Sequence, residues 1–187
     1  VIAEDKKVRE KVEAGNIHSL ALKQDGTIWS WGDNSQGEMG NGQINSIKTD
    51  EPTQIKTGVY TEVKQEQTDE GSTQITTTQI EVNLDNIKDI AAGYYYNLAV
   101  DSNGYVYSWG YNGYGQLSQG NRSNVDEPVP VKVQKNSENT EEEPEYEILK
   151  DIVEIKAGND NLQMVSKGGS LYVSGYSGYG QLGTGEY

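Results

Sequence analysis

Three segments of this 187-residue chain each contain five glycines with identical spacing. The first glycine of a segment is Gly15, Gly93 or Gly158, and glycine follows each of them at offsets of 11, 17, 22 and 27 residues. Such internal repetition is typical of arrays of equivalent units that stack on one another. Because glycine at a fixed offset marks positive φ or a close backbone approach, we interpret these glycines as structural. The nine in clearest register are Gly15, Gly32, Gly37, Gly93, Gly110, Gly115, Gly158, Gly175 and Gly180.

Between these glycines, apolar and polar residues alternate with a period of two. Residues 19–22 read Ser-Leu-Ala-Leu, an Asp25-Gly26 pair follows, and residues 27–31 read Thr-Ile-Trp-Ser-Trp. The second copy has the same order around Asn103-Gly104. Alternating runs joined by Asp-Gly or Asn-Gly are typical of β-hairpins. With one short apolar strand before the hairpin and one after it, each copy predicts about four strands, the content of a propeller blade.

The motifs of these copies resemble the regulator of chromosome condensation (RCC) repeat. The resemblance rests on residues 14–37, which contain His-Ser-Leu-Ala-Leu and Trp-Ser-Trp-Gly, on residues 92–120, and on residues 157–185, where Ser174 replaces the tryptophan. It implies a β-propeller, usually of seven blades, in which Trp31 and Trp109 pack between adjacent blades. We expect a bacterial member of the family.

The repeat register also predicts how the chain is organised. We expect one partial propeller over 1–187, either a three-blade arc or a fragment of a larger ring, because closed propellers have at least about four blades. The copies stand 78 and 65 residues apart, which leaves room for two insertions. The expected divisions are a first repeat at 8–56, an inserted β-hairpin at 57–83, a second repeat at 84–133, an acidic loop at 134–148 and a third repeat at 149–187.

Charge and composition exclude several classes of function. The chain has 29 acidic and 15 basic side chains, and the net charge of −14 repels phosphate backbones and anionic lipid. We therefore expect no nucleic-acid partner, and without a run of 18 apolar residues we expect no membrane insertion. The absence of cysteine excludes disulfides and zinc–thiolate sites. This acidic composition, rich in Thr, Asn and Gln, favours an extracellular or cell-surface location and leaves the cytoplasm open.

No residue pattern predicts catalysis. His18 is the only histidine, and it lies at a repeat position taken by Tyr96 and Asn161 in the other copies. Residues 33–38 resemble a calcium loop, but the glycine stands fifth instead of sixth and the twelfth position has no glutamate. We find no acid–base pair or activated nucleophile, so we expect no enzyme activity, no metal and no cofactor.

The tyrosines are the best candidates for a binding site. Tyr111 and Tyr176 share one repeat offset, and Tyr114 and Tyr179 share another. In a ring of blades, equal offsets lie at equal heights on one face, so these side chains predict an aromatic band. Tyrosine suits interfaces because it buries a large area and keeps a polar tip. The alternative is that tyrosines fill the blade seams of a protein that has no phenylalanine. The six candidates for partner contact are Tyr94, Tyr95, Tyr111, Tyr114, Tyr176 and Tyr179.

Three functions are compatible with these features. The first is a non-catalytic protein-interaction propeller within a larger bacterial surface or secreted protein. The second is an enzyme inhibitor of the β-lactamase-inhibitor type, and the third is guanine-nucleotide exchange. The terminal copies keep apolar residues such as Leu20, Leu22, Leu162 and Met164, so neither copy looks like a polar cap. We therefore expect the ends to be covered by further blades of a longer chain or by a second copy in a homo-oligomer.

Overall fold

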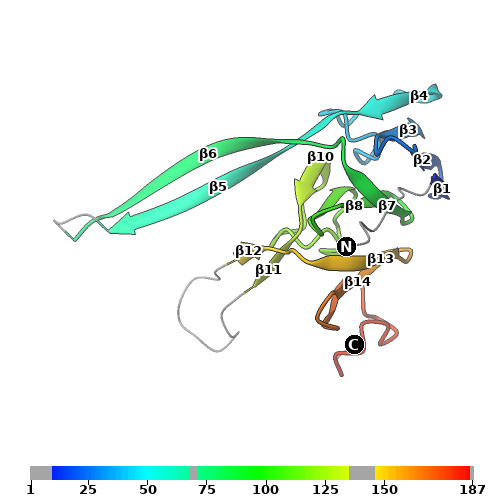
Figure 1. Cartoon of the computed structure of the whole chain (residues 1–187). Coiled ribbons are helices and arrows are strands. Elements are labelled where there is room, and N and C mark those ends of the chain that lie inside the picture. Colours follow the sequence, from blue (N-terminus) through cyan, green and yellow to red (C-terminus); the bar gives the residue numbers. More distant parts are fainter. Residues whose placement is uncertain (1–9, 68–70, 135–145, 186–187) are drawn as a thin grey trace, which may run out of the picture.

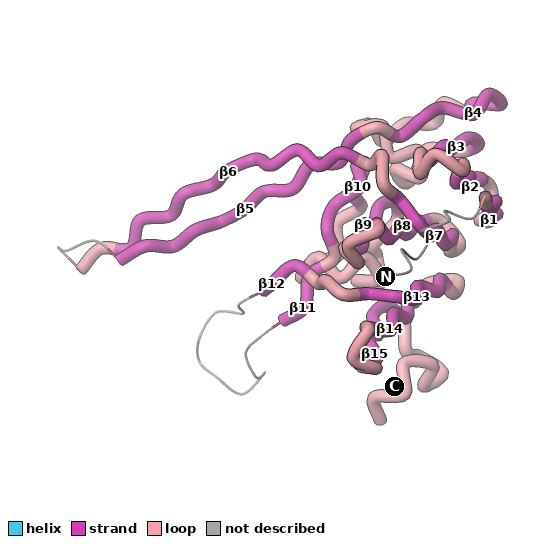
Figure 2. The backbone as a smooth tube through the Cα atoms, viewed as in Figure 1, coloured by secondary structure: helices cyan, strands magenta, loops and turns pink. Residues whose placement is uncertain are grey.

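The computed structural model describes residues 10–67, 71–134 and 146–185, and strands are the only regular structure there (Figures 1 and 2). The predicted all-β class is confirmed. In the described residues no helix is long and apolar enough to span a membrane.

Three antiparallel sheets correspond to the three repeats. In each sheet every strand pairs with the next one along the chain. Blade 1 consists of β1 (Lys11–Ala14), β2 (His18–Leu22), β3 (Ile28–Gly32) and β4 (Thr49–Ile55). Blade 2 consists of β7 (Ile87–Ala92), β8 (Tyr96–Asp101), β9 (Val106–Gly110) and β10 (Val125–Pro130). Blade 3 has three described strands, β13 (Ile152–Ala157), β14 (Asn161–Ser166) and β15 (Leu171–Gly175).

Two further strand pairs interrupt the blades. Strands β5 (Thr57–Gln67) and β6 (Thr73–Asn83) form a long hairpin that projects from the blades (Figure 1). Strands β11 (Lys132–Gln134) and β12 (Tyr146–Ile148) pair at the base of the acidic insertion, whose residues 135–145 lie outside the described part. Because Lys132 and Val133 pair with β12, the insertion begins slightly before residue 134.

The recurrent glycines adopt backbone conformations that other residues avoid. All those at offsets 11, 17, 22 and 27 have positive φ, from +73° at Gly180 to +111° at Gly32. At Gly104 an added Cβ would also lie 2.8 Å from Cα of Asp151, in the next blade. The hairpin turn therefore needs glycine for its torsion and for the close approach of the neighbouring blade.

Two hydrophobic seams join the blades. The first seam, between blades 1 and 2, includes Leu20, Ile28 and the fully buried Trp109. The second seam, between blades 2 and 3, includes Leu98 and Ile155. Blade 2 lies between the two seams and contributes alternate side chains to each, with Ala99 in the first and Leu98 in the second, as the period-two pattern requires.

The apolar residues Leu20, Leu22, Leu162 and Met164 of the two terminal repeats are all buried in the two seams, so they do not lie on the end faces of the blades. The apolar pattern alone does not tell which of the two faces of a strand meets a neighbour. The face of blade 1 turned away from blade 2 carries the residues that lie between the seam residues along each strand. Coverage of the ends by further blades or a second copy stays a prediction.

The same hydrogen bond recurs in both seams with different donors. In the first seam, Trp109 Nε1 donates to the Glu38 carbonyl at 2.9 Å. In the second, Ser174 Oγ donates to the Gln116 carbonyl at 3.1 Å. Trp109 and Ser174 share one repeat offset, and Glu38 and Gln116 share another. The third repeat therefore keeps the seam contact although it lacks the tryptophan.

Glu38 is a buried acid in a position where the other repeats have glutamine. Its Oε2 accepts from Gln36 N at 2.8 Å, whereas Oε1 has no partner among the described residues. Gln116 and Gln181 accept the same backbone bond, from Tyr114 N at 3.1 Å and Tyr179 N at 2.9 Å. Burial raises the pKa of Glu38 above its ordinary value of 4.5, because the charged form loses its hydration.

We expect Glu38→Gln to raise the free energy of unfolding by about 1 kcal/mol at pH 7, since a neutral amide is less costly to bury than a carboxylate. In the wild type, the cost of burying the charged Glu38 carboxylate is fully present above the pKa that Glu38 has in the folded state. This cost disappears below the pKa that Glu38 has in the unfolded chain, because the side chain is then neutral in both states. Urea unfolding between pH 4 and 8 should therefore show a gain that shrinks as pH falls. Gln116→Glu is the mirror control and should destabilise at pH 7. A gain that is independent of pH would contradict this explanation.

Candidate protein-binding face

One face of the blades gathers the six predicted tyrosines. Tyr94 and Tyr95 lie in the turn between β7 and β8, Tyr111 and Tyr114 follow β9, and the remaining two follow β15. In an antiparallel meander, the turn after the first strand and the loop after the third lie at the same end of the sheet. The local topology therefore places all six residues at one edge of blades 2 and 3.

The six rings form one continuous row, which we call the tyrosine ladder. From Tyr94 to Tyr95 the ring centroids are 4.6 Å apart, and from Tyr95 to Tyr111 they are 6.4 Å apart. The separation from Tyr111 to Tyr114 is 6.1 Å. The ladder then crosses to blade 3, with 5.0 Å from Tyr114 to Tyr176 and 6.1 Å from Tyr176 to Tyr179. Four of these five contacts are edge-to-face, the arrangement that aromatic quadrupoles favour.

Two glycines make room for rings of the ladder. A Cβ added to Gly113 would lie 2.1 Å from the hydroxyl oxygen of Tyr111. The same atom added to Gly178 would lie 2.0 Å from the hydroxyl oxygen of Tyr176. Each ring therefore lies back over its own loop, and the repeat copies this arrangement from blade 2 to blade 3.

Backbone hydrogen bonds hold the turns beneath the ladder together. Asn16 N donates to the Tyr94 carbonyl at 3.1 Å, and Tyr94 N donates to the Asn159 carbonyl at 3.0 Å. These three residues share one repeat offset, so the same bond links each blade to the next. The spacing of the ladder is therefore fixed by the backbone as well as by ring contacts.

Exposure separates the ladder from the tyrosines of the seams. Tyr94, Tyr114 and Tyr179 are 40%, 42% and 86% exposed, and the other three ladder rings are half-buried. Tyr96 and Tyr107, by contrast, are buried in the seams. Burial raises the pKa of Tyr96, whose hydroxyl donates to the Asn161 carbonyl in blade 3. Tyrosine thus has two roles in this chain, and the ladder presents an aromatic surface to solvent.

His18 belongs to the first seam, where its buried ring contacts a side chain of blade 2. Its Nε2 lies 2.9 Å from Asn97 Oδ1 in blade 2, and burial lowers its pKa. Asn97 Nδ2 in turn donates to the Glu38 carbonyl at 2.9 Å. Asn97 is not among the residues predicted from the sequence. It lies on the same face of β8 as the buried Ala99, and a polar side chain at a buried strand position indicates a hydrogen-bonding role. Among the described residues no group of three potential metal ligands occurs.

The glycines that open the repeats accommodate the side chain three residues later. A Cβ on Gly15 would lie 2.1 Å from the His18 ring, and one on Gly93 would lie 1.9 Å from the Tyr96 ring. At Gly158 the added atom would lie 2.8 Å from Asn161 Oδ1. These glycines are needed for space, whereas those at later offsets have positive φ and several of them, such as Gly32 and Gly110, also lie against neighbouring backbone.

Comparison with known proteins agrees with this architecture. One profile of the regulator of chromosome condensation (RCC1) repeat matches residues 10–38 and 87–116. A second profile with the same description matches residues 25–65 and 103–161, more than half of the chain. The chain belongs to the RCC1 repeat family. The family predicted from the motifs is thereby confirmed, and a bacterial origin stays a prediction.

Related RCC1 proteins are much longer than this chain. The ultraviolet-B receptor UVR8 of Arabidopsis thaliana is 28% identical over 95% of this chain and 31% of its own length. The RCC2 homologue of Danio rerio is 30% identical over 89% of this chain and 26% of its own length. The crystal structure of Prp20p from Saccharomyces cerevisiae is similar with a TM-score of 0.60 and 20% identity, over 95% of this chain and 34% of Prp20p. This likeness confirms the RCC1 propeller fold.

Proposed function

We propose that this chain is a non-catalytic module that binds another protein through the tyrosine ladder. The observation that carries the proposal is the continuous row of six rings, of which Tyr94, Tyr114 and Tyr179 are substantially exposed. Rings that already lie in fixed positions lose little conformational freedom on binding, and tyrosine combines a large apolar area with a hydroxyl. These are the properties of residues that dominate the energy of protein interfaces.

Two further features support a protein as the partner. Prp20p, which has the same fold, binds Gsp1p and histones, and this binding is a property of that protein. The net charge of −14 disfavours nucleic acid as an alternative partner here. Location at a bacterial surface or in a secreted protein is part of the proposal and rests on composition. An inhibitor would use the same ladder, and it would capture one enzyme whose activity falls on binding.

The test is affinity capture from extracellular and cellular extracts with wild-type protein and two triple variants. Tyr94→Ser, Tyr114→Ser and Tyr179→Ser together remove the exposed rings and should reduce capture of the specific partner about tenfold or more. The matched control replaces exposed apolar residues outside the ladder, Ile47, Ile75 and Tyr105, with serine. The control should capture as the wild type does. Equal loss in both variants, or none in the ladder variant, would contradict the proposal.

A further inference from the structure

The hairpin of β5 and β6 is a two-stranded ribbon that stands apart from the blades (Figures 1 and 2). Its register runs without a bulge through all eleven residues of each strand. Its base is fixed, because Leu84 is buried and an added Cβ on Gly58 would lie 1.9 Å from the Pro128 carbonyl oxygen. A ribbon of only two strands is at most marginally stable in water, so this ribbon would gain stability from a further strand.

The outer edge of β6 presents the N–H and C=O groups of alternate residues. Leu84 N donates to the Lys56 carbonyl at 2.9 Å, so Leu84 and the even-numbered residues of β6 bond toward β5. Among the described strands only β5 pairs with β6. Of the odd-numbered residues, Asn83 lies next to the blades. The other five are symmetric about the middle one, and they are Thr73, Ile75, Thr77, Gln79 and Glu81.

Strand β6 lacks the features that discourage pairing at other edges of this chain. The outer strands of blades 1 and 2, β4 and β10, each contain Asp-Glu-Pro and pair with a shift in register. Strand β5 contains Glu62, Lys64 and Glu66. In β6, by contrast, residues 73–80 include no charge and no proline. Because charges, prolines and bulges protect edge strands, β6 is the edge of the ribbon that is open to another strand.

A second copy of β6 matches this edge. In an antiparallel pair centred on Thr77, Thr76 of one copy stands opposite Thr78 of the other, and threonine pairs across strands are stabilising. The charged residue of this stretch, Glu81, stands opposite Thr73, so the pairing brings no like charges together. The same geometry occurs twice, because a two-fold axis relates the copies.

The net charge of −14 is compatible with this pairing. Antiparallel pairing places the blades of the two copies at opposite ends of the joined ribbons. From Thr77 to Asn83 a strand extends about 20 Å, so the two sets of blades lie about 40 Å apart. Salt screens charges over about 8 Å at physiological ionic strength, so repulsion between the blades is weak. Ile75, which is 61% exposed, would gain cover from Gln79 of the second copy.

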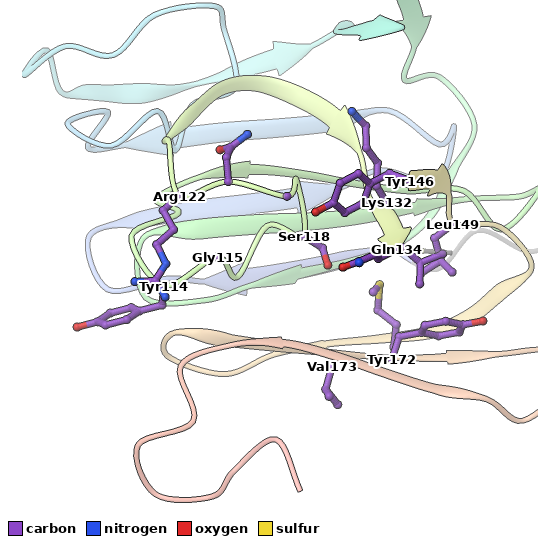
Figure 3. Close-up of a pocket in the computed structure, with 14 residues that line it drawn as sticks. Tyr114, Gly115, Ser118, Arg122, Lys132, Gln134, Tyr146, Leu149, Tyr172 and Val173 are labelled. Carbon is purple, nitrogen blue, oxygen red and sulfur yellow. The ribbon is translucent and has the colours of Figure 1, made fainter. Parts of the chain in front are cut away.

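The ribbon is also separate from the other open surfaces of the described residues. A pocket of about 650 Å³ lies between blades 2 and 3 (Figure 3), and its lining residues, such as Tyr114 and Tyr172, all lie outside β5 and β6. The tyrosine ladder likewise contains no residue of the ribbon. A strand bound to β6 therefore leaves the ladder free for its own partner.

We propose that β6 pairs with β6 of a second copy of this chain, antiparallel and centred on Thr77. The two ribbons then form one four-stranded sheet in the order β5, β6, β6, β5. Backbone pairing supplies the affinity, and the matching register of an identical strand supplies the selectivity. The charged β5 strands protect both outer edges, so pairing ends at two copies. The dimer presents two tyrosine ladders.

The first test uses single cysteines, because the chain has none of its own. In the proposed pair the two Thr77 residues stand opposite each other with Cα atoms about 5.5 Å apart, within reach of a disulfide. Thr77→Cys should therefore form a crosslinked dimer under mild oxidation. Thr61→Cys, at an exposed position of β5, is the control and should stay monomeric on a reducing-agent-free gel. The absence of a crosslink from Thr77→Cys, or equal crosslinking from both variants, would overturn the proposal.

The second test measures mass by light scattering over a concentration series. We expect the wild type to dimerise with Kd on the order of 10 μM. Thr76→Glu with Thr78→Glu places like charges opposite each other and should weaken the dimer about tenfold or more. Thr76→Glu with Thr78→Lys changes the same positions but places opposite charges across the pair, and it should retain the dimer. Equal weakening in both variants, with circular dichroism unchanged, would contradict the register.

A peptide with the sequence of residues 73–81 distinguishes a second copy from another occupant. It should bind the full chain and compete with dimerisation. If the peptide binds while the full chain stays monomeric at about 1 mM, the edge serves a strand of another protein and the proposal is overturned. None of these variants alters the tyrosine ladder, so dimerisation and capture through the ladder can fail separately.

Discussion

Replacing Trp109 with alanine is expected to lower the free energy of unfolding by about 3–5 kcal/mol. The indole is fully buried in the first seam, and its Nε1 donates to the Glu38 carbonyl at 2.9 Å. Truncation would leave a cavity between two blades and remove one of the two side-chain donors to that carbonyl, the other being Asn97. Urea denaturation followed by circular dichroism would measure the loss.

Trp31 is the matched control because it has the same repeat offset in blade 1. It lies on the face turned away from blade 2 and is half-buried. Trp31→Ala should therefore cost much less, about 1 kcal/mol, since less apolar area is lost. Equal losses at the two positions would show that the seam between blades 1 and 2 contributes no more than an open face.

Gly110→Ala is expected to destabilise the chain by about 3 kcal/mol or more. Gly110 ends β9 with φ at +103°, a conformation that alanine rarely adopts. An added Cβ would lie 2.5 Å from the Tyr95 carbonyl oxygen and 2.8 Å from Cα of Tyr96. Because both neighbours are backbone atoms, relief requires the turn that carries Tyr95 and the start of β8 to move.

Gly115 separates torsional strain from crowding. It also has positive φ, +75°, but an added Cβ would meet nothing within 4 Å. Gly115→Ala should therefore cost about 1 kcal/mol, the penalty of a left-handed conformation alone. Thermal unfolding of both variants compares the two effects, and a Gly110→Ala variant as stable as Gly115→Ala would contradict the close approach described for β9.

The repeat register was enough to predict much of the ladder. Tyr111 and Tyr176 occupy equal offsets, as do Tyr114 and Tyr179, and equal offsets in stacked blades lie on the same face. The turn glycines were predictable for the same reason, because a fixed offset preserves a fixed torsion. The alternative that tyrosines fill the seams applies to Tyr96, which the structure buries.

Contacts between blades were beyond the reach of the pattern. Period-two alternation divides a strand into two faces, but it does not say which face meets which neighbour. The partners of the Glu38 carbonyl, Asn97 and Trp109, lie 59 and 71 residues further along the chain and are joined to it only by blade packing.

Photo-crosslinking tests most directly the claim that the ladder is a protein-binding surface. A photoreactive phenylalanine analogue at position 114 or 179 would report contacts of the ladder, and the same analogue at position 105 would report an exposed tyrosine site outside it. Irradiation in the extract that yields the captured partner should give one crosslinked species from positions 114 and 179 and none from position 105. Crosslinking to that partner from position 105 alone would contradict the account.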